Sequence, residues 1–79
     1  MHLTSAEKKA VLTGIGAEIR RRRRKPGISQ GALARKAGVH CNVVGRIERG
    51  KYNPSVMTLD AIAYALNTSI ADLLRRAFK

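Results

Sequence analysis

Apolar residues recur at three- and four-residue spacing along this chain, and no segment alternates apolar and polar residues as a half-buried strand does. The pattern predicts an all-α protein of five helices. For the first helix, Thr4 and Glu7 form a Thr-x-x-Glu capping signal, and Pro26 with Gly27 ends the segment. Its buried stripe is expected at Leu12, Ile15 and Ile19.

Two glycines interrupt this first segment. Gly14 and Gly16 each lower helix stability by about 1 kcal/mol relative to alanine. We therefore expect its first two turns to be frayed or kinked. Residues 1–8 are expected either to be disordered or to extend the helix.

Two short helices are expected on either side of Gly38. Ser29 is a candidate N-cap for the second helix, and the third covers about residues 40–49. Gly38 supplies the positive φ of a sharp turn, Ala34 is small where the helices would cross, and Val39 would fill the angle between them. An ordinary helical hairpin does not require this combination. The pattern predicts a helix-turn-helix unit, whose second helix enters the major groove of DNA.

Two more helices follow a polar loop. The fourth is expected over about residues 57–66, ending at Asn67, which tolerates a left-handed conformation. Ser69 and Asp72 cap the fifth. Its apolar stripe is Ile70, Leu73, Leu74 and Ala77.

The charge is strongly positive and unevenly distributed. The formal net charge is +11, and the segment between Ile19 and Ile47 contains nine Lys or Arg residues and no acid. A polyanionic partner would relieve this self-repulsion by releasing counterions, whereas the alternative is a merely solubilising surface. With only three aromatic residues, the chain lacks the stacking platforms of single-strand binders.

Composition also limits the possible chemistry. The five acidic residues are scattered, and no nucleophile, base and orienting group are paired, so we expect no enzyme and no cofactor. No sensory domain is apparent, so no small-molecule ligand is expected. A metal site would need three or four ligands, and His2 is the only histidine besides His40. The single cysteine, Cys41, excludes an internal disulfide. Without a signal peptide or apolar span, a cytoplasmic protein with no membrane partner is expected.

Five motifs together carry a resemblance to a known family. They are Ser29-Gln30-x-x-Leu33-Ala34, Ala37-Gly38-Val39, Ile47-Glu48-Arg49-Gly50, Asn53-Pro54-Ser55 and Thr58-Leu59-x-x-Ile62-Ala63-x-Ala65-Leu66. The chain resembles the phage-repressor-type (lambda-repressor-like) helix-turn-helix family, and its short form is similar to the controller proteins of restriction–modification systems. The resemblance implies one compact five-helix domain over residues 1–79, acting as a homodimer on a palindromic double-stranded DNA operator.

The outer face of the third helix is the candidate reading surface. At 100° per residue, Asn42, Arg46 and Arg49 point away from the buried positions, and Gly45 beside them would keep the surface flat. Asn pairs with adenine and Arg with guanine in the major groove. Arg49 fits a phosphate contact better than a base contact.

The resemblance implies base contacts at Cys41, Asn42 and Arg46, with His40 just before them. Two readings of Cys41 remain open: a small side chain against a thymine methyl group, or a redox-sensitive thiol favoured by a helix N-terminus in a basic field. The resemblance also implies that Gln30 binds a phosphate, where the N-terminus of the second helix adds free N–H groups. The loop residues Lys51, Tyr52 and Asn53 are further phosphate candidates, although Tyr52 could instead pack over the third helix.

One buried ion pair is expected. Arg23 follows Ile19 by four residues and so lies on the buried stripe of the first helix, and Glu48 follows Val44 by four on the inner edge of the third. A pair between Arg23 and Glu48 would satisfy two charges that are costly to bury alone. The family resemblance independently implies a salt bridge at these positions.

The fourth helix is apolar on two sides, which favours self-association. Met57, Ala61 and Tyr64 form a second stripe opposite the buried one. Ile70, Leu74 and Phe78 could widen this patch. A two-fold axis through it would place two recognition helices about 34 Å apart, one turn of DNA.

The sequence thus predicts a homodimeric transcription regulator. Two rivals remain: a related protein whose main partner is another protein, such as an antitoxin or a small prophage repressor, and a non-specific RNA or nucleoid binder. An antitoxin would need a further surface or tail, and none is apparent up to Lys79. A non-specific binder would show no preference among duplex sequences.

Overall fold

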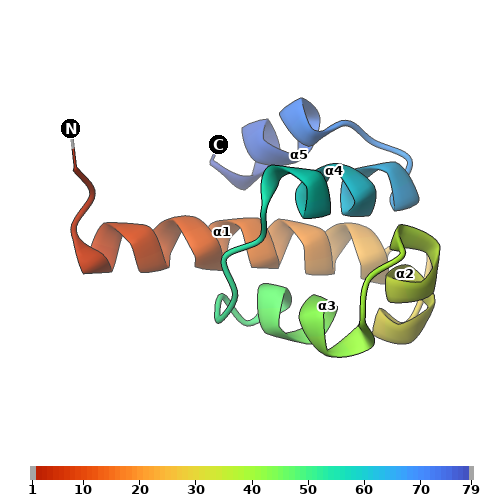
Figure 1. Ribbon diagram of the computed structural model, residues 1–79. Helices are drawn as coiled ribbons and strands as arrows, with labels where there is room; N and C mark the ends of the chain where they lie inside the picture. Colours follow the sequence, from red (N-terminus) through yellow and green to blue (C-terminus); the bar gives the residue numbers. More distant parts are fainter. Residues whose placement is uncertain (1, 79) are drawn as a thin grey trace.

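Five helices account for the regular structure of residues 2–78, the part of the chain that this computed structural model describes (Figure 1). No strand occurs within that part, so the all-α prediction is confirmed. The helices are α1 (Ser5–Arg24), α2 (Gln30–Ala37), α3 (Cys41–Glu48), α4 (Val56–Ala65) and α5 (Ile70–Ala77). Their bounds lie within two residues of those expected.

The helix ends follow local capping chemistry. Thr4 and Glu7 form the expected reciprocal box: the Thr4 N–H donates to the Glu7 carboxylate at 2.8 Å, and the Glu7 N–H donates to the Thr4 hydroxyl at 3.1 Å. Ser29 and Ser69 cap α2 and α5 as expected. Asn67 ends the segment after α4 with φ +59°, the left-handed conformation that the sequence indicated.

The prediction of a frayed or kinked α1 is wrong, because its glycines have a packing role. The helix is continuous from Ser5 to Arg24. Gly16 is buried against the end of α3, where an added Cβ would overlap the carbonyl oxygen of Ile47 and lie 2.9 Å from that of Glu48. The missing side chain lets the two helices approach closely, and the packing outweighs the weak helix propensity of glycine.

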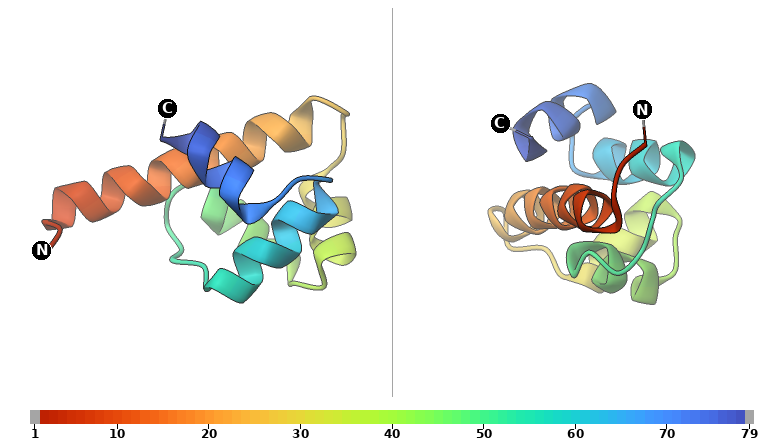
Figure 2. Two further views of the ribbon diagram at one scale, coloured as in Figure 1. Left: turned by 90° about the horizontal axis from the view of Figure 1, so that it is seen from above. Right: turned by 90° about the vertical axis from the view of Figure 1, so that its left-hand side faces the viewer.

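The N-terminal turns of α1 project beyond the other helices (Figure 2). This projection stretches the molecule to 36 Å along one axis, against 23 and 20 Å along the others. Helix begins at Ser5, so residues 5–8 form the first turn of α1, and Met1 lies outside the described residues.

The long helix α1 runs through the middle of the fold, with α3 on one side and α5 on the other (Figure 1). Helix α2 packs on both α3 and α4, and α4 also contacts α5. The buried apolar core is made by Ile15, Ile19, Leu33, Ala34, Val44, Ile47, Leu59, Ile62, Ala63, Ala65 and Leu73. This arrangement holds α3 at an edge of the molecule with its outer face uncovered.

Candidate nucleic-acid interface

The turn between α2 and α3 has the geometry that the sequence predicted. Gly38 ends α2 at φ +73°, and the Val39 N–H donates to the Ala34 carbonyl at 2.9 Å. Ala34 is 2% exposed, so a larger residue would separate the two helices. Val39 packs partly buried against the core. The two short helices therefore form a fixed unit.

Helix α3 has one buried side and one exposed side. Val44 and Ile47 are 0% and 1% exposed. The predicted readers Cys41, Asn42 and Arg46 are all exposed, as is the preceding His40. A shallow hollow of about 270 Å³ runs along this side, and it is lined by Gln30, Cys41, Asn42, Gly45, Arg46 and Arg49.

His40 has a structural task that the sequence analysis missed. It is the N-cap of α3, and its Nδ1 accepts a hydrogen bond from the Asn42 N–H at 3.1 Å. Because Nδ1 is the acceptor, the neutral ring carries its proton on Nε2. His40 therefore caps α3 through Nδ1 and keeps Nε2–H as a donor on an exposed ring. The exposed thiol of Cys41 lies 3.9 Å from the same Nδ1.

Arg46 is oriented by an aromatic neighbour. Its guanidinium carbon lies 5.2 Å from the centre of the Tyr52 ring, a cation–π arrangement. Tyr52 is partly buried and packs against the core, so packing over α3, one of its two expected roles, is what the structure has. This contact restricts the rotamers of Arg46 without hiding it from solvent.

Gly45 does not form an open flat surface, and that expectation is wrong. It is buried, because the Gln30 and Arg49 side chains cover it, each 3.3 Å from where a Cβ would stand. The Gln30 amide also donates to the Glu48 carboxylate at 3.0 Å. Gln30 thus fastens the start of α2 to α3 with its side-chain amide, while its backbone opens the helix.

The expected Arg23–Glu48 salt bridge is confirmed. Arg23 donates to both carboxylate oxygens, from Nε at 2.6 Å and from Nη2 at 3.0 Å, and its Nη1 donates to the Ile28 carbonyl at 2.9 Å. The hydrogen bonds to Glu48 raise the pKa of the Arg23 guanidinium. The pair joins α1 to α3, the helix whose outer face carries the candidate base contacts.

Two further carboxylates form ion pairs with arginines of the run at residues 20–24, and the sequence analysis missed both. Glu18 is buried and accepts from Arg21 and Arg22 at 2.6 Å each. Its spacing to both arginines, three and four residues, was a signal that could have revealed these pairs. Arg22 also donates to Asp72 of α5 at 2.8 Å, and no local pattern could have indicated a pair 50 residues apart.

These ion pairs also lower the pKa of the Glu18 and Asp72 carboxyl groups. The hydrogen bonds from Arg21 hold the pKa of Glu18 below its ordinary value, although burial acts in the opposite direction. Hydrogen bonds from Arg22 and then Thr68 lower the pKa of Asp72. Both groups are therefore ionised at neutral pH.

Three of the candidate phosphate contacts are accessible to solvent. Arg49, Lys51 and Asn53 are exposed at the end of α3 and in the following loop. On α4, Met57 and Tyr64 are 76% and 78% exposed.

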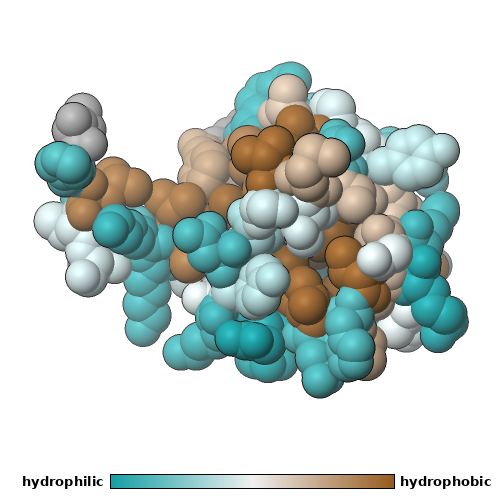
Figure 3. All heavy atoms as spheres, viewed as in Figure 1, coloured by the Kyte–Doolittle hydropathy of each residue, from teal (hydrophilic) through white to brown (hydrophobic). Residues whose placement is uncertain are grey.

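The predicted apolar patch is not uniformly exposed. The structure adds Val56, 71% exposed, which the sequence analysis did not include. Ala61 is partly buried, Phe78 is exposed, and Ile70 and Leu74 are partly buried against the core, so they contribute only their edges. Figure 3 shows apolar side chains gathered over α4 and hydrophilic ones along the edge formed by α3. None of the described helices is long and apolar enough to cross a membrane.

Comparisons with known proteins agree with this geometry. The family model for the helix-turn-helix matches residues 19–73. An uncharacterised HTH-type transcriptional regulator of Archaeoglobus fulgidus is 44% identical over 55 residues, 70% of this chain and 79% of that protein. The control protein C.SmaI of Serratia marcescens is 37% identical over 62 residues, 78% of this chain and 74% of that protein.

A solved structure is similar over most of its length. The restriction–modification controller protein C.AhdI of Aeromonas hydrophila has a TM-score of 0.76 and 34% identity, covering 78% of this chain and 94% of that one. The fold, the exposed face of α3 and these relatives all indicate the same family. The chain belongs to the helix-turn-helix family of DNA-binding transcriptional regulators.

Proposed function

We propose that this chain is a homodimer that inserts α3 of each copy into the major groove of a palindromic operator. The observation that carries the proposal is the outer face of α3. Asn42 and Arg46 are exposed there, while Val44 and Ile47 hold the opposite side in the core. Both exposed residue types form bidentate hydrogen bonds with base edges, and the buried ion pair behind them fixes the helix that carries them.

The surrounding residues divide by what they would contact. His40, Cys41, Asn42 and Arg46 are the proposed base contacts. Phosphates would be bound on both flanks of the groove, where contacts set register rather than sequence. The proposed phosphate contacts are Gln30, Arg49, Lys51, Tyr52 and Asn53.

Dimerisation is supported by the exposed apolar side of α4. Val56, Met57 and Tyr64 are each more than 70% exposed, an unusual cluster for one ten-residue helix. A two-fold axis through this side buries it against its own copy. The proposed interface consists of Met57, Ala61, Tyr64, Ile70, Leu74 and Phe78, to which Val56 is added.

The likeness to C.SmaI and C.AhdI supports a controller role in a restriction–modification system for this chain as well. A small prophage repressor or an antitoxin is the alternative, since either would use the same fold. We propose a cytoplasmic DNA-binding function without catalysis.

Selection of bound duplexes from a random pool tests the proposal. We expect an inverted repeat whose half-sites are centred about 10 base pairs apart, one turn of DNA. The matched control is the Asn42→Ala/Arg46→Ala variant, which should lose the consensus while still retaining duplexes at low salt. A wild-type pool without any enriched sequence would favour the non-specific alternative.

A further inference from the structure

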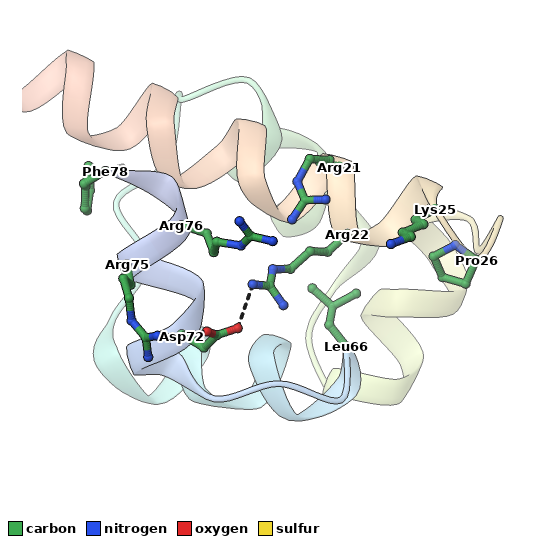
Figure 4. Close-up of a pocket in the computed structure, with 9 residues that line it drawn as sticks. All are labelled: Arg21, Arg22, Lys25, Pro26, Leu66, Asp72, Arg75, Arg76 and Phe78. Carbon is green, nitrogen blue, oxygen red and sulfur yellow. Dashed lines mark hydrogen bonds and ion pairs between the residues drawn. The ribbon is translucent and has the colours of Figure 1, made fainter.

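A basic cleft lies between the C-terminal half of α1 and α5 (Figure 4). Because α5 and α3 lie on opposite sides of α1, this cleft is remote from the reading face (Figures 1 and 2). Its volume is about 900 Å³. The residues that line this α1–α5 cleft are Arg21, Arg22, Lys25, Pro26, Leu66, Asp72, Arg75, Arg76 and Phe78.

The cations of the α1–α5 cleft outnumber the carboxylates available to them. Five Lys or Arg side chains line it, and Asp72 is the one lining carboxylate. Asp72 forms an ion pair with Arg22 at 2.8 Å and a longer one with Arg75 at 3.7 Å. Glu18, which does not line the cleft, forms ion pairs with Arg21 and with Arg22.

Two cleft cations are left without an acidic partner. Within residues 2–78, no carboxylate lies within 4 Å of Lys25 or Arg76, and the other three cations of the cleft share Glu18 and Asp72. Both side chains are exposed and carry no structural contact of that kind. Such an excess of like charge on a concave surface is unfavourable unless an anion occupies it.

The side chains also point in the required direction. In Figure 4 the Arg21 and Arg22 side chains of α1 and the Arg76 side chain of α5 extend into the same space. Guanidinium groups from two helices therefore face a common centre. The planar guanidinium fork can bind two oxygens of a phosphate group at once.

We propose that the α1–α5 cleft binds a polyphosphate anion, such as the triphosphate chain of a nucleotide. Three uncompensated positive charges in one cavity require a ligand with several negative charges in a small volume. Leu66 and Pro26 supply apolar wall against which the organic part of a nucleotide can pack. Because α3 and α5 lie on opposite sides of α1, a duplex bound on the outer face of α3 and an anion in the α1–α5 cleft would occupy different sides of the molecule.

Titration calorimetry with inorganic triphosphate and with ATP, at 150 mM salt, tests the proposal. We expect saturable binding of one anion per chain, weakened at least tenfold by Lys25→Gln/Arg76→Gln. The matched control is Arg35→Gln/Lys36→Gln on α2, which removes the same two charges from an exposed site outside the cleft and should change affinity less than twofold. Equal affinity for both ligands would show that the cleft recognises the phosphate chain alone. Tighter binding of ATP would show that the apolar wall also contacts the nucleoside.

The test is independent of the operator proposal. Arg46→Ala should lose duplex affinity and keep triphosphate binding, and Lys25→Gln/Arg76→Gln should show the reverse. The proposal is overturned if the wild type binds neither anion, if both double variants weaken binding equally, or if the cleft variant loses affinity only for duplex DNA.

Discussion

Arg23 of α1 and Glu48 of α3 form a buried ion pair, 2.6 Å between Nε and the carboxylate, in which the Glu48 side chain is only 3% exposed. Gln30 of α2 donates to the same carboxylate at 3.0 Å. One acidic group therefore ties together three helices, and it does so directly beneath the surface proposed to read DNA. The pair couples the stability of the fold to the position of α3.

Loss of Arg23 should be costly, because it leaves a buried carboxylate with Gln30 as its remaining side-chain donor. We expect Arg23→Ala to lower the free energy of unfolding by about 3 kcal/mol, and Arg23→Ala/Glu48→Ala to lose clearly less than the sum of the two single losses. Denaturant unfolding of the four proteins measures this coupling. Additive losses would mean that the two charges act independently.

Gly16 is predicted to be intolerant of even a methyl group. Its Cβ would overlap the Ile47 carbonyl oxygen, so α1 and α3 would have to separate in Gly16→Ala. We expect a net loss of about 1–3 kcal/mol in the free energy of unfolding, despite the better helix propensity of alanine. Gly31→Ala is the control, since its Cβ would meet nothing closer than 3.7 Å. Equal effects of the two substitutions would contradict the close approach.

Acid should destabilise the protein through Glu18 and Asp72. Ion pairing keeps the pKa of each carboxyl below its ordinary value, 4.5 for Glu and 3.8 for Asp, so the unfolded chain takes up protons first as the pH falls. The stabilisation is complete above those ordinary values and is lost as the pH falls through the lowered ones. Glu18→Gln/Asp72→Asn should therefore flatten the dependence of stability on pH between 5 and about 3.

Urea unfolding across that pH range measures the effect. Asp60→Asn is the matched control, because Asp60 is exposed on α4 and joins none of the ion pairs found within residues 2–78. An unchanged slope in the double variant, or the same change in the control, would show that these ion pairs do not cause the acid sensitivity.

Local chemistry made much of the fold predictable. The capping box at Thr4, the positive φ of Gly38 and the alternation of buried and exposed positions on α3 depend on neighbours within one or two turns, and all three are confirmed. Arg23 and Glu48 could be paired because each extends a buried stripe by four residues. Such inferences need only helix periodicity.

The features that escaped prediction depend on how separate helices meet. Gly16 looks like a weak helix position until α3 is placed against it, and Gly45 looks open until Gln30 and Arg49 are laid over it. The contact between Arg22 and Asp72 joins residues 50 positions apart. No spacing in the sequence reports where α5 lies relative to α1, so the cleft between them could not be foreseen.

Base readers and phosphate anchors should respond differently to substitution. Asn42→Ala and Arg46→Ala should each cost about 1–3 kcal/mol on the selected operator and relax preference at particular base pairs. Lys51→Ala should weaken all duplexes alike and reduce the salt dependence of binding by about one unit. Affinity on operator and scrambled duplexes across a salt series separates the two classes, and uniform losses for Asn42→Ala would remove it from the readers.

The contact between Arg46 and Tyr52 adds a finer expectation. Tyr52→Phe keeps the ring that lies 5.2 Å from the guanidinium and should keep base preference, whereas Tyr52→Ala frees Arg46 and should weaken it. The cost should appear at the base pair that Arg46→Ala relaxes, which the same operator set measures. Loss of preference at a different base pair would show that Tyr52 does not act through Arg46.

Dimerisation should depend on the exposed side of α4. Val56, Met57 and Tyr64 leave a large apolar area in water, and a second copy turned by a two-fold axis would cover it. Tyr64→Glu places a charge in that interface while leaving the fold intact, because Tyr64 is 78% exposed in the single chain.

We expect the wild type to sediment as a dimer at micromolar concentration and Tyr64→Glu as a folded monomer with helix content unchanged. Lys36→Glu, which places the same residue at an exposed position on α2, is the control and should remain dimeric. A monomeric wild type, or a Tyr64→Glu variant that dimerises as tightly as the wild type, would show that the two copies do not meet through this side of α4.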